Sequence, residues 1–275
     1  MFELPEVVTL ARQLNESIRG KTVRHGSLGN KPHKFVWYNR SHEEFARLVP
    51  GKTVEEARTR GRWLFVPLLP GYVLTFGEFG GRLLYHAPGV EVPATYHLLV
   101  SFDDGSSLTA LTQMWGAMEL FDSGQELERK YVKDMRPTPL EPEFTFDYFS
   151  QLVDEQSREK RSVKGLLTQD QLIPGLGNAI AQDIMFRARL NPKRMISALT
   201  VEQRRVLYDA VGTVIRESIA QGGRSDEHDL FDRPGSYVRI MDRDAAGKPC
   251  PACGHTIQKI QYLGGACYFC PSCQS

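Results

Sequence analysis

Hydrophobic positions at the start of the chain follow a helical period. Val7, Leu10, Leu14 and Ile18 recur at intervals of three and four residues, which places them on one face of a helix. Gly20 follows this run, at a position where helices commonly end. The pattern therefore predicts an amphipathic helix that opens the chain and packs its apolar face against a core.

The period then shortens to that of β-strands. Asp103-Asp104-Gly105-Ser106 lies between two apolar runs and is a typical hairpin turn. Short strands without long helices between them favour an antiparallel sandwich, and one short helix is expected at 41–48. The predicted strands are 35–38, 62–68, 71–76, 97–103 and 107–111.

The second half of the chain is helical. The polar segment at 122–142 contains several prolines and is typical of a linker. Residues 222–235 show no hydrophobic periodicity, which predicts a flexible loop. Helices are expected at 143–153, 157–168, 178–190 and 200–221. The sequence thus predicts an α+β multidomain protein with four parts: a β-sandwich with flanking helices at 1–121, the linker at 122–142, a helical domain at 143–235 and a cysteine-bearing ribbon at 236–275.

Composition excludes several classes of protein. The 275 residues are 41% hydrophobic and 24% charged, which is ordinary for a globular protein and unlike a disordered chain or a disulfide-stapled scaffold. No apolar run is long enough to span a membrane, and the start of the chain does not resemble a secretory signal. We therefore expect a cytoplasmic protein. The net charge of +1 gives no overall electrostatic argument for nucleic acid.

All five cysteines lie after residue 249. Cys250 and Cys253 form one C-x-x-C pair, and Cys270 and Cys273 form a second pair after an interval of sixteen residues. Four thiolates at this spacing predict one structural Zn²⁺ in tetrahedral coordination, with a disulfide pair or an iron cluster as the alternatives. A closed four-cysteine site folds the ribbon and performs no chemistry itself. Cys267 is expected to be a buried small side chain.

A glycine-rich turn joins two of the predicted helices. Gly175 and Gly177 allow positive φ and expose backbone N–H groups, and Asn178 stands where the next helix begins. Exposed amides at a helix N-terminus suit a phosphate; a plain inter-helix turn is the alternative. Basic residues outnumber acidic ones in the stretch that follows: Arg187, Arg189, Lys193, Arg194, Arg204 and Arg205.

These motifs together resemble one family over nearly the whole chain. An N-terminal Glu-Leu-Pro-Glu-Val, then strands, then Pro-Gly-Leu-Gly-Asn opening a helix, then a four-cysteine ribbon are similar to the formamidopyrimidine-DNA glycosylase / endonuclease VIII family. The resemblance implies a β-sandwich, a helix–two-turn–helix domain and a zinc ribbon, with damaged or abasic double-stranded DNA bound between the halves by a monomer. It also implies base excision repair in the cytoplasm, at the nucleoid if the source is bacterial. A damaged base is flipped out of the duplex, and an N-terminal proline amine attacks the sugar and goes on to strand elimination.

Several residues match the family's functional positions. Glu3 matches a general acid/base beside the nucleophile and Glu6 a second glutamate, although carboxylates are also favoured in the first turn of any helix. Lys164 resembles a lysine that precedes the two-turn motif, and Asn178 resembles the asparagine that grips a DNA phosphate. Cys250, Cys253, Cys270 and Cys273 match the zinc ligands.

The chain departs from the family mainly where the chemistry occurs. Phe2 stands at the position of the catalytic proline, and its bulk hinders removal of Met1, so the free amine lies one residue early. The Met1 amine can still form a Schiff base, although a misplacement of ~1 Å can cost about a hundredfold in rate. Arg62 occupies the position of a catalytic lysine, where it can contact phosphate but cannot act as an amine nucleophile.

Contacts to DNA are also altered. Gly265 stands where an arginine usually grips phosphates, and Glu78 would repel DNA if it faced the groove. Phe79, Gln113 and Trp115 occupy a region that can fill the hole left by an extruded base, whereas Phe79 and Trp115 can equally be sandwich core. Fewer cations imply weaker duplex binding with a shallower salt dependence, since each phosphate contact adds about 0.9 to the slope.

Three functions remain open at this point. The first is a DNA N-glycosylase with altered or weakened AP-lyase chemistry, in which Glu3 or Glu6 activates water or the Met1 amine replaces the proline. The second is a catalytically inactive paralogue that binds damaged DNA. The third is a scaffold turned to another ligand, such as RNA or a protein.

Overall fold

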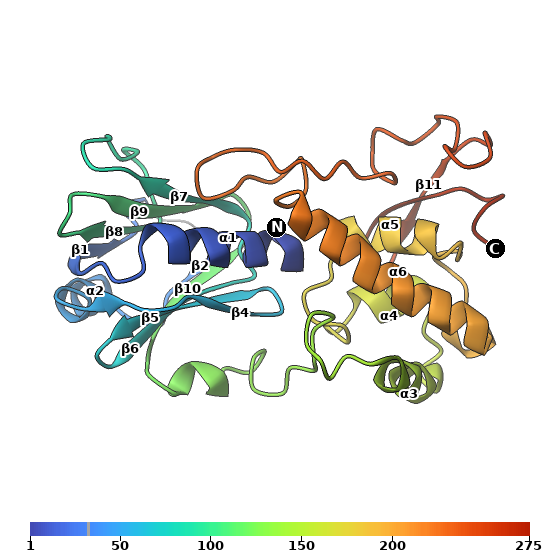
Figure 1. Ribbon diagram of the computed structural model, residues 1–275, viewed down its shortest axis with the longest axis horizontal. Coiled ribbons are helices and arrows are strands. Elements are labelled where there is room, and N and C mark those ends of the chain that lie inside the picture. The colour runs from blue at the N-terminus through green and yellow to red at the C-terminus, as the bar shows by residue number, and fades with distance from the viewer. Residues whose placement is uncertain (32–33) are drawn as a thin grey trace. The chain divides into compact units, whose positions relative to one another are not determined.

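A computed structural model of the chain describes residues 1–31 and 34–275. It divides into two compact units, which are described separately (Figure 1). Unit 1 comprises Met1–Asp134 and Gln221–Ser236, and unit 2 comprises Met135–Ala220 and Tyr237–Ser275. The loop after residue 220, assigned from sequence to the helical domain, thus lies in the same unit as the N-terminus.

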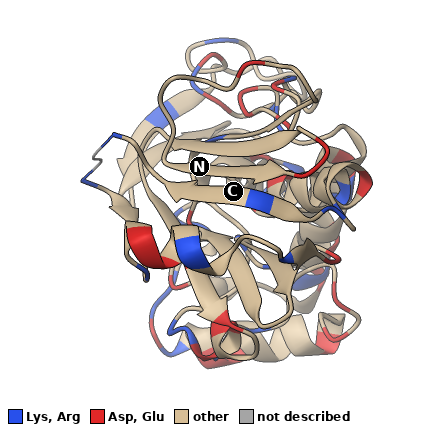
Figure 2. Cartoon of the chain, turned by 90° about the vertical axis from the view of Figure 1, so that its left-hand side faces the viewer, with Lys and Arg blue, Asp and Glu red and all other residues tan. Residues whose placement is uncertain are grey.

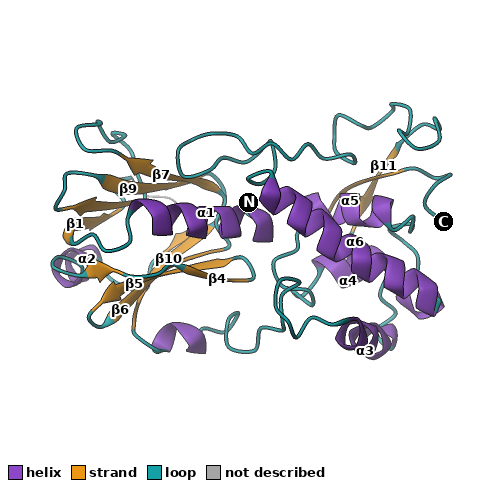
Figure 3. Cartoon of the chain, in the orientation of Figure 1, coloured by secondary structure: helices purple, strands orange, loops and turns teal. Residues whose placement is uncertain are grey.

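Unit 1 is built on two β-sheets (Figure 3). One sheet has the strand order β1-β8-β9-β7, and the other has the order β2-β10-β6-β5-β3 with β4 paired to β5. All pairs are antiparallel except β2 with β10. The strands are β1 Val23–Leu28, β2 Val36–Trp37, β3 Thr53–Val54, β4 Arg58–Arg60, β5 Trp63–Leu69, β6 Tyr72–Gly77, β7 Gly81–His86, β8 Leu98–Phe102, β9 Ser107–Thr112 and β10 Gly116–Asp122.

Helix α1, Leu4–Ser17, joins the two sheets into one core. Its residues Leu10 and Leu14 are buried in the same cluster as Leu64 of β5 and Val100 of β8. The predicted opening helix is therefore confirmed, as is the short helix near 41–48, which is α2, His42–Leu48. The sandwich and its flanking helices agree with the predicted fold class.

The predicted hairpin at Asp103–Ser106 is also confirmed, since it connects β8 to β9. The other predicted strands correspond to β2, β5 and β6 within two residues. β1, β3, β4, β7 and β10 were not predicted from the sequence. A 3₁₀ turn at Gln125–Glu128 lies within the expected linker.

Unit 2 contains four helices and a two-stranded ribbon. The helices are α3 Phe146–Ser157, α4 Val163–Thr168, α5 Asn178–Arg187 and α6 Val201–Ala220, with a 3₁₀ turn at Ile196–Ala198; the strands are β11 Gln258–Tyr262 and β12 Gly265–Phe269. The continuous helix predicted at 157–168 is wrong. Lys160 has a positive φ of 51°, and the Ser162 side chain accepts a hydrogen bond from the Gly165 N–H and starts a new helix there.

The ribbon is attached to α5 through one buried carboxylate. Asp183 of α5 accepts hydrogen bonds from the Tyr237 hydroxyl and from the backbone N–H groups of Ile240 and Met241. Burial raises the pKa of Asp183 despite these donors. Gln182 accepts a further bond from the Tyr268 N–H at 2.6 Å. The ribbon therefore takes its position from α5, the helix that follows the glycine turn.

Candidate functional site

The N-terminus of α1 is the centre of a buried cluster of charges. The Met1 ammonium donates to Glu227 Oε1 at 2.8 Å. Arg224 contacts Glu6 through Nε and Nη2, both at 3.1 Å, and its Nη1 lies 4.0 Å from Glu3. Glu3, Glu6 and Arg224 are each at most 4% exposed. The N-terminal amine and the two glutamates singled out from sequence are thus brought together, with two loop residues among them.

Arg224 is the cation on which this cluster depends. Burial lowers the pKa of its guanidinium, but the carboxylates of Glu6 and Glu3 outweigh burial and raise it. The backbone N–H of Arg224 also donates to Glu6 at 3.0 Å, and Glu6 in turn caps α1 by accepting from the Glu3 N–H at 2.8 Å. In this arrangement both glutamates act in capping and ion pairing, and neither carboxylate is accessible to bulk water.

Arg224 and Glu227 were missed because they belong to the aperiodic loop 222–235. The loop has no helix or strand, as expected, but contacts hold it along α1. Gln13 donates to Asp229 at 2.8 Å and accepts from the Leu230 N–H at 3.0 Å. The one signal available was the density of charged residues in Arg-Ser-Asp-Glu-His-Asp, which a solvated loop also explains.

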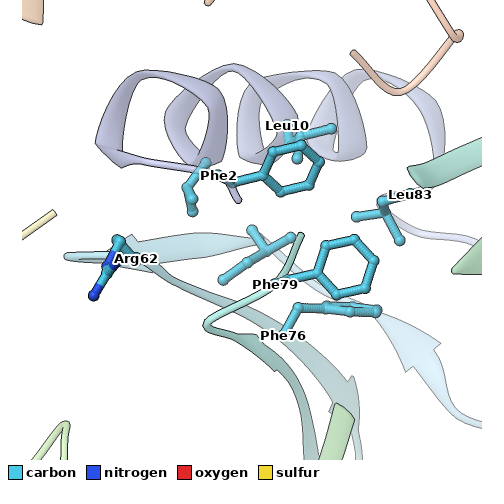
Figure 4. A pocket seen from close by; sticks show the side chains of 8 residues that line it. Phe2, Leu10, Arg62, Phe76, Phe79 and Leu83 are labelled. Atoms are coloured by element: carbon cyan, nitrogen blue, oxygen red, sulfur yellow. The ribbon is translucent and has the colours of Figure 1, made fainter. Parts of the chain in front are cut away.

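Phe2 does not lie at a reactive surface. Its ring is 3% exposed and packs against Phe79 with the centroids 5.5 Å apart. Both rings line a small apolar pocket with Leu10, Phe76 and other core side chains (Figure 4). The phenylalanine at the usual proline position is therefore a core residue, and so is Phe79, which rules it out as an exposed wedge.

Arg62 lies beside Met1. Its Nη2 forms an ion pair with Glu78 Oε2 at 3.0 Å, and its Nη1 contacts Met1 Sδ at 3.3 Å. Glu78 adopts a positive φ of 46° in the turn between β6 and β7. The ion pair offsets the acidic charge that Glu78 would otherwise present alone, and it leaves the guanidinium in contact with the Met1 side chain.

Gln113 and Trp115 follow β9 and are exposed. The Gln113 N–H donates to Gly80 O at 2.8 Å, and the Gly80 N–H donates to Trp115 O at 3.0 Å. A Cβ on Gly80 would lie only 3.1 Å from Met1 Cα. The loop that carries Gln113 and Trp115 is thus in close contact with the N-terminus through Gly80.

In unit 2, three positions identified from sequence converge on the turn between β11 and β12. Lys164 Nζ donates to Tyr262 O at 2.6 Å and lies 3.4 Å from Gly265 O. Asn178 Nδ2 donates to Ala266 O at 3.1 Å. Lys164 is only 1% exposed, and burial lowers the pKa of its ammonium. Lys164 therefore supports the ribbon turn from inside, while Asn178 lies at its edge.

The glycine turn differs in detail from the turn predicted from the sequence. Gly175 has the expected positive φ of 92°, but its N–H donates to the Gln171 side chain at 3.0 Å and is not left exposed. Gly177 is the N-cap of α5 in extended backbone, and Asn178 is the first helical residue. Asn178 therefore does not cap α5, and its side-chain amide donates to the ribbon instead.

Part of the basic stretch is paired or stacked within unit 2. Arg187 pairs with Glu217, Arg204 pairs with Asp154 at 2.7 Å, and Arg205 lies over the Phe146 ring. Figure 2 shows basic and acidic residues interspersed along the chain. The local excess of arginine in the sequence is therefore partly balanced by acidic partners in α3 and α6.

The four expected cysteine ligands come together at one point. Their sulfur atoms all lie within 4.8 Å of one another, with Cys253 and Cys270 at 3.5 Å and Cys250 and Cys273 at 3.8 Å. A tetrahedral ion with metal–sulfur bonds of about 2.3 Å requires sulfur separations of about 3.8 Å. The arrangement fits a four-thiolate metal site. Cys267 is fully buried and outside the group.

Comparison with known proteins gives matches along the whole chain. Residues 1–113 match the formamidopyrimidine-DNA glycosylase N-terminal domain, and residues 135–229 match the formamidopyrimidine-DNA glycosylase H2TH domain. The formamidopyrimidine-DNA glycosylase of Desulfitobacterium hafniense is 30% identical over 280 residues and covers 100% of both chains. That of Bacillus cereus is 28% identical over 278 residues, covering 100% of this chain and 99% of its own.

Solved structures agree with these sequence matches. The Lactococcus lactis Fpg, in complex with DNA that contains an abasic site, superposes with a TM-score of 0.85 at 25% identity and 99% coverage of each chain. The MutM (Fpg) protein of Thermus thermophilus superposes with a TM-score of 0.83 at 27% identity, covering 99% of this chain and 98% of its own.

The helices within residues 1–31 and 34–275 include none that combines the length and the hydrophobicity needed for a membrane span.

Proposed function

Because the chain belongs to the formamidopyrimidine-DNA glycosylase family, we propose that it is a base excision repair DNA N-glycosylase with altered or weakened AP-lyase chemistry. Its substrate is damaged or abasic double-stranded DNA, which it binds as a monomer. We expect it to act in the cytoplasm, at the nucleoid in a bacterium. Full-length similarity to glycosylases, one of them solved on abasic-site DNA, supports the substrate class.

The observation that carries the altered chemistry is the primary amine of Met1 paired with Glu227, in a chain with no proline at position 2 and with Arg62 against the Met1 side chain. In the proposed reaction Glu227 accepts the proton that the ammonium loses. The amine nitrogen then attacks C1′ of the sugar, forming a C–N bond while the base leaves with the electrons of the N-glycosidic bond. The departing base takes up the second proton of the attacking amine. The nitrogen lone pair then breaks the C1′–O4′ bond, O4′ takes the proton held by Glu227, and the opened sugar is joined to Met1 as a protonated Schiff base. Proton loss at C2′ of this Schiff base expels the 3′ phosphate and breaks the strand.

Weak lyase activity follows from the same geometry. The amine is one residue early, and its ion pair with Glu227 must open before it can attack. Arg62 holds a phosphate near the sugar but supplies no second amine. Glu3 and Glu6 are occupied by Arg224, so we assign the nucleophile to Met1 and not to a water activated by either glutamate.

Each unit contributes residues that we assign to DNA binding. Asn178 and the Gly177 backbone contact phosphate in this proposal, while the Gly175 N–H stays bonded to Gln171. Lys164 positions the ribbon turn beside Asn178. Gln113 and Trp115 fill the space of the extruded base. The four cysteines Cys250, Cys253, Cys270 and Cys273 hold one structural Zn²⁺, the ion that favours a closed four-thiolate site.

The alternative function is a paralogue that binds damaged DNA without cutting it. The buried pairing of Arg224 with both glutamates favours it, because these carboxylates are held by the guanidinium and are not open to a substrate while that contact lasts. Loss of the proline and of the lysine at position 62 points the same way.

One assay separates the two functions. Duplexes with an oxidised purine, an oxidised pyrimidine or an abasic site are incubated with the protein and reduced with borohydride, after intact-mass measurement of the N-terminus. A trapped adduct on Met1 or released base supports the glycosylase. Selective binding of the abasic duplex without product supports the paralogue, and failure to bind any DNA at low salt contradicts both.

A further inference from the structure

Three exposed aromatic rings lie together on unit 1. Phe35 and Trp37 flank Val36 at β2, and Trp115 precedes β10, the strand with which β2 pairs in parallel. The Trp37 and Trp115 rings are parallel within 5° with their centroids 5.8 Å apart, and Phe35 lies 4.6 Å from Trp115. The rings are 37%, 47% and 39% exposed for Phe35, Trp37 and Trp115. We call these three residues the aromatic platform.

Core packing does not account for the platform. Unit 1 has its own cluster of buried apolar side chains, which contains none of these three rings among its buried residues. Adjacent exposed aromatic rings on a folded domain are uncommon without a ligand. Trp115 lies between the other two, so the outer face of Trp37 is the surface left for a further ring to stack upon.

Charge indicates the class of that ligand. Residues 30–41 and 105–118 contain no Asp or Glu, whereas Lys31 and Lys34 are exposed within the first segment, and Lys34 Nζ lies 5.5 Å from the Phe35 ring centroid. The carboxylate of Asp122 at the end of β10 is paired with Arg40 at 2.8 Å. Lysine is depleted at protein–protein interfaces, whereas exposed rings flanked by cations are typical of surfaces that bind unpaired nucleic acid.

The platform is also connected to the N-terminus. Trp115 O accepts from the Gly80 N–H, and Gly80 packs directly on Met1. We propose that the aromatic platform stacks unpaired nucleobases of a DNA strand, with Trp37 as its outer ring, and so directs the protein to lesions in single-stranded or locally opened DNA. This rests on the proposed DNA-repair function and specifies the form of its substrate.

The test measures the affinity for a single-stranded oligothymidylate of about ten nucleotides. Fluorescence anisotropy at low salt reports the binding. Trp37→Ala is expected to weaken binding about tenfold, since stacking contributes about 1–3 kcal/mol per base. Trp37→Phe keeps a ring and should retain most of the affinity. Tyr131→Ala is the matched control, because Tyr131 is 62% exposed and flanked by Arg129 and Lys130 but lies outside the platform.

Equal affinity of the wild type and Trp37→Ala overturns the proposal, provided that thermal melting shows both folded. Failure of the wild type to bind oligothymidylate also overturns it. The same holds if the wild type elutes as a dimer and Trp37→Ala elutes as a monomer, because the platform is then an interface between two copies of the chain. An abasic duplex is titrated in parallel. If the duplex binds and the single strand does not, the platform proposal fails while the repair function stands; if neither binds, both fail.

Discussion

Among the residues of the N-terminal cluster, substitution of Arg224 is expected to lower the free energy of unfolding most. Arg224→Met leaves Glu6 and Glu3 buried without a cation, and breaking a buried pair in this way costs about 3–5 kcal/mol. Denaturant unfolding measures the loss in free energy of unfolding. Arg82→Met is the control, because Arg82 pairs with exposed Asp232 on the same loop and surface pairs contribute at most about 1 kcal/mol. Similar losses for both variants would contradict the role given to Arg224.

Gly265 tests whether the ribbon turn contacts phosphate. A Cβ at this position meets the Asn178 side chain at 3.4 Å, an ordinary contact, so Gly265→Arg can be accommodated and adds a cation beside Asn178. We expect tighter duplex binding and a salt slope that is steeper by about 0.9. Binding isotherms at several salt concentrations measure the slope, with Gly265→Gln as the uncharged control. An unchanged slope for the arginine variant would place the phosphates elsewhere.

Sequence reasoning found some site residues and missed others for a physical reason. The cysteines were identified because their ligand spacing is local, and Glu3 and Glu6 because they lie in a recognisable motif. Arg224 escaped notice because its partner Glu6 is 218 residues away and its loop has no period. Long-range ion pairs leave no local pattern, so a single sequence does not reveal them.

The same distinction applies to whole elements. Helix α1 and the β8–β9 hairpin were predicted because apolar spacing and turn residues are local signals. The helix expected at 157–168 failed because Ser162, a capping residue, marks a new start inside an otherwise helical stretch. Strand β10 was missed because its register is set by pairing with β6, which no local pattern encodes.

The ribbon is the element expected to depend on metal. Its two strands bury few side chains of their own, and zinc binding contributes about 10 kcal/mol to the folding of such units. Chelation, or Cys253→Ser, should expose the backbone amides of β11 and β12 to hydrogen exchange while those of unit 1 stay protected. Elemental analysis gives the metal content. Cys267→Ala removes a cysteine outside the ligand group and should keep one zinc per chain; loss of zinc from this variant instead would contradict the ligand assignment.

For the whole molecule, the fold of the family is present, and the N-terminus is where we propose that the chemistry differs. Phe2 contributes to the core, and the Met1 amine is paired with Glu227, at the place where the family resemblance predicts a proline nucleophile. The DNA contacts that we propose for Asn178 and the ribbon turn do not depend on this difference, because these residues belong to unit 2. Binding and bond breaking are therefore expected to respond separately to mutation.

Restoring the family's nucleophile tests this separation. In Phe2→Pro/Arg62→Lys the small second residue permits removal of Met1, which leaves a secondary amine at the N-terminus and a lysine that keeps the charge facing Glu78. Loss of the buried Phe2 ring costs about 3 kcal/mol, yet borohydride trapping on abasic duplex should rise by up to about a hundredfold, since ~1 Å of misplacement costs that much. Phe2→Ala/Arg62→Lys is the matched control for the packing loss, because its terminal amine is primary. If intact mass shows that the proline variant has lost Met1 and the duplex still binds without more adduct, the sugar does not reach the N-terminus, and a binding protein is the better description of the chain.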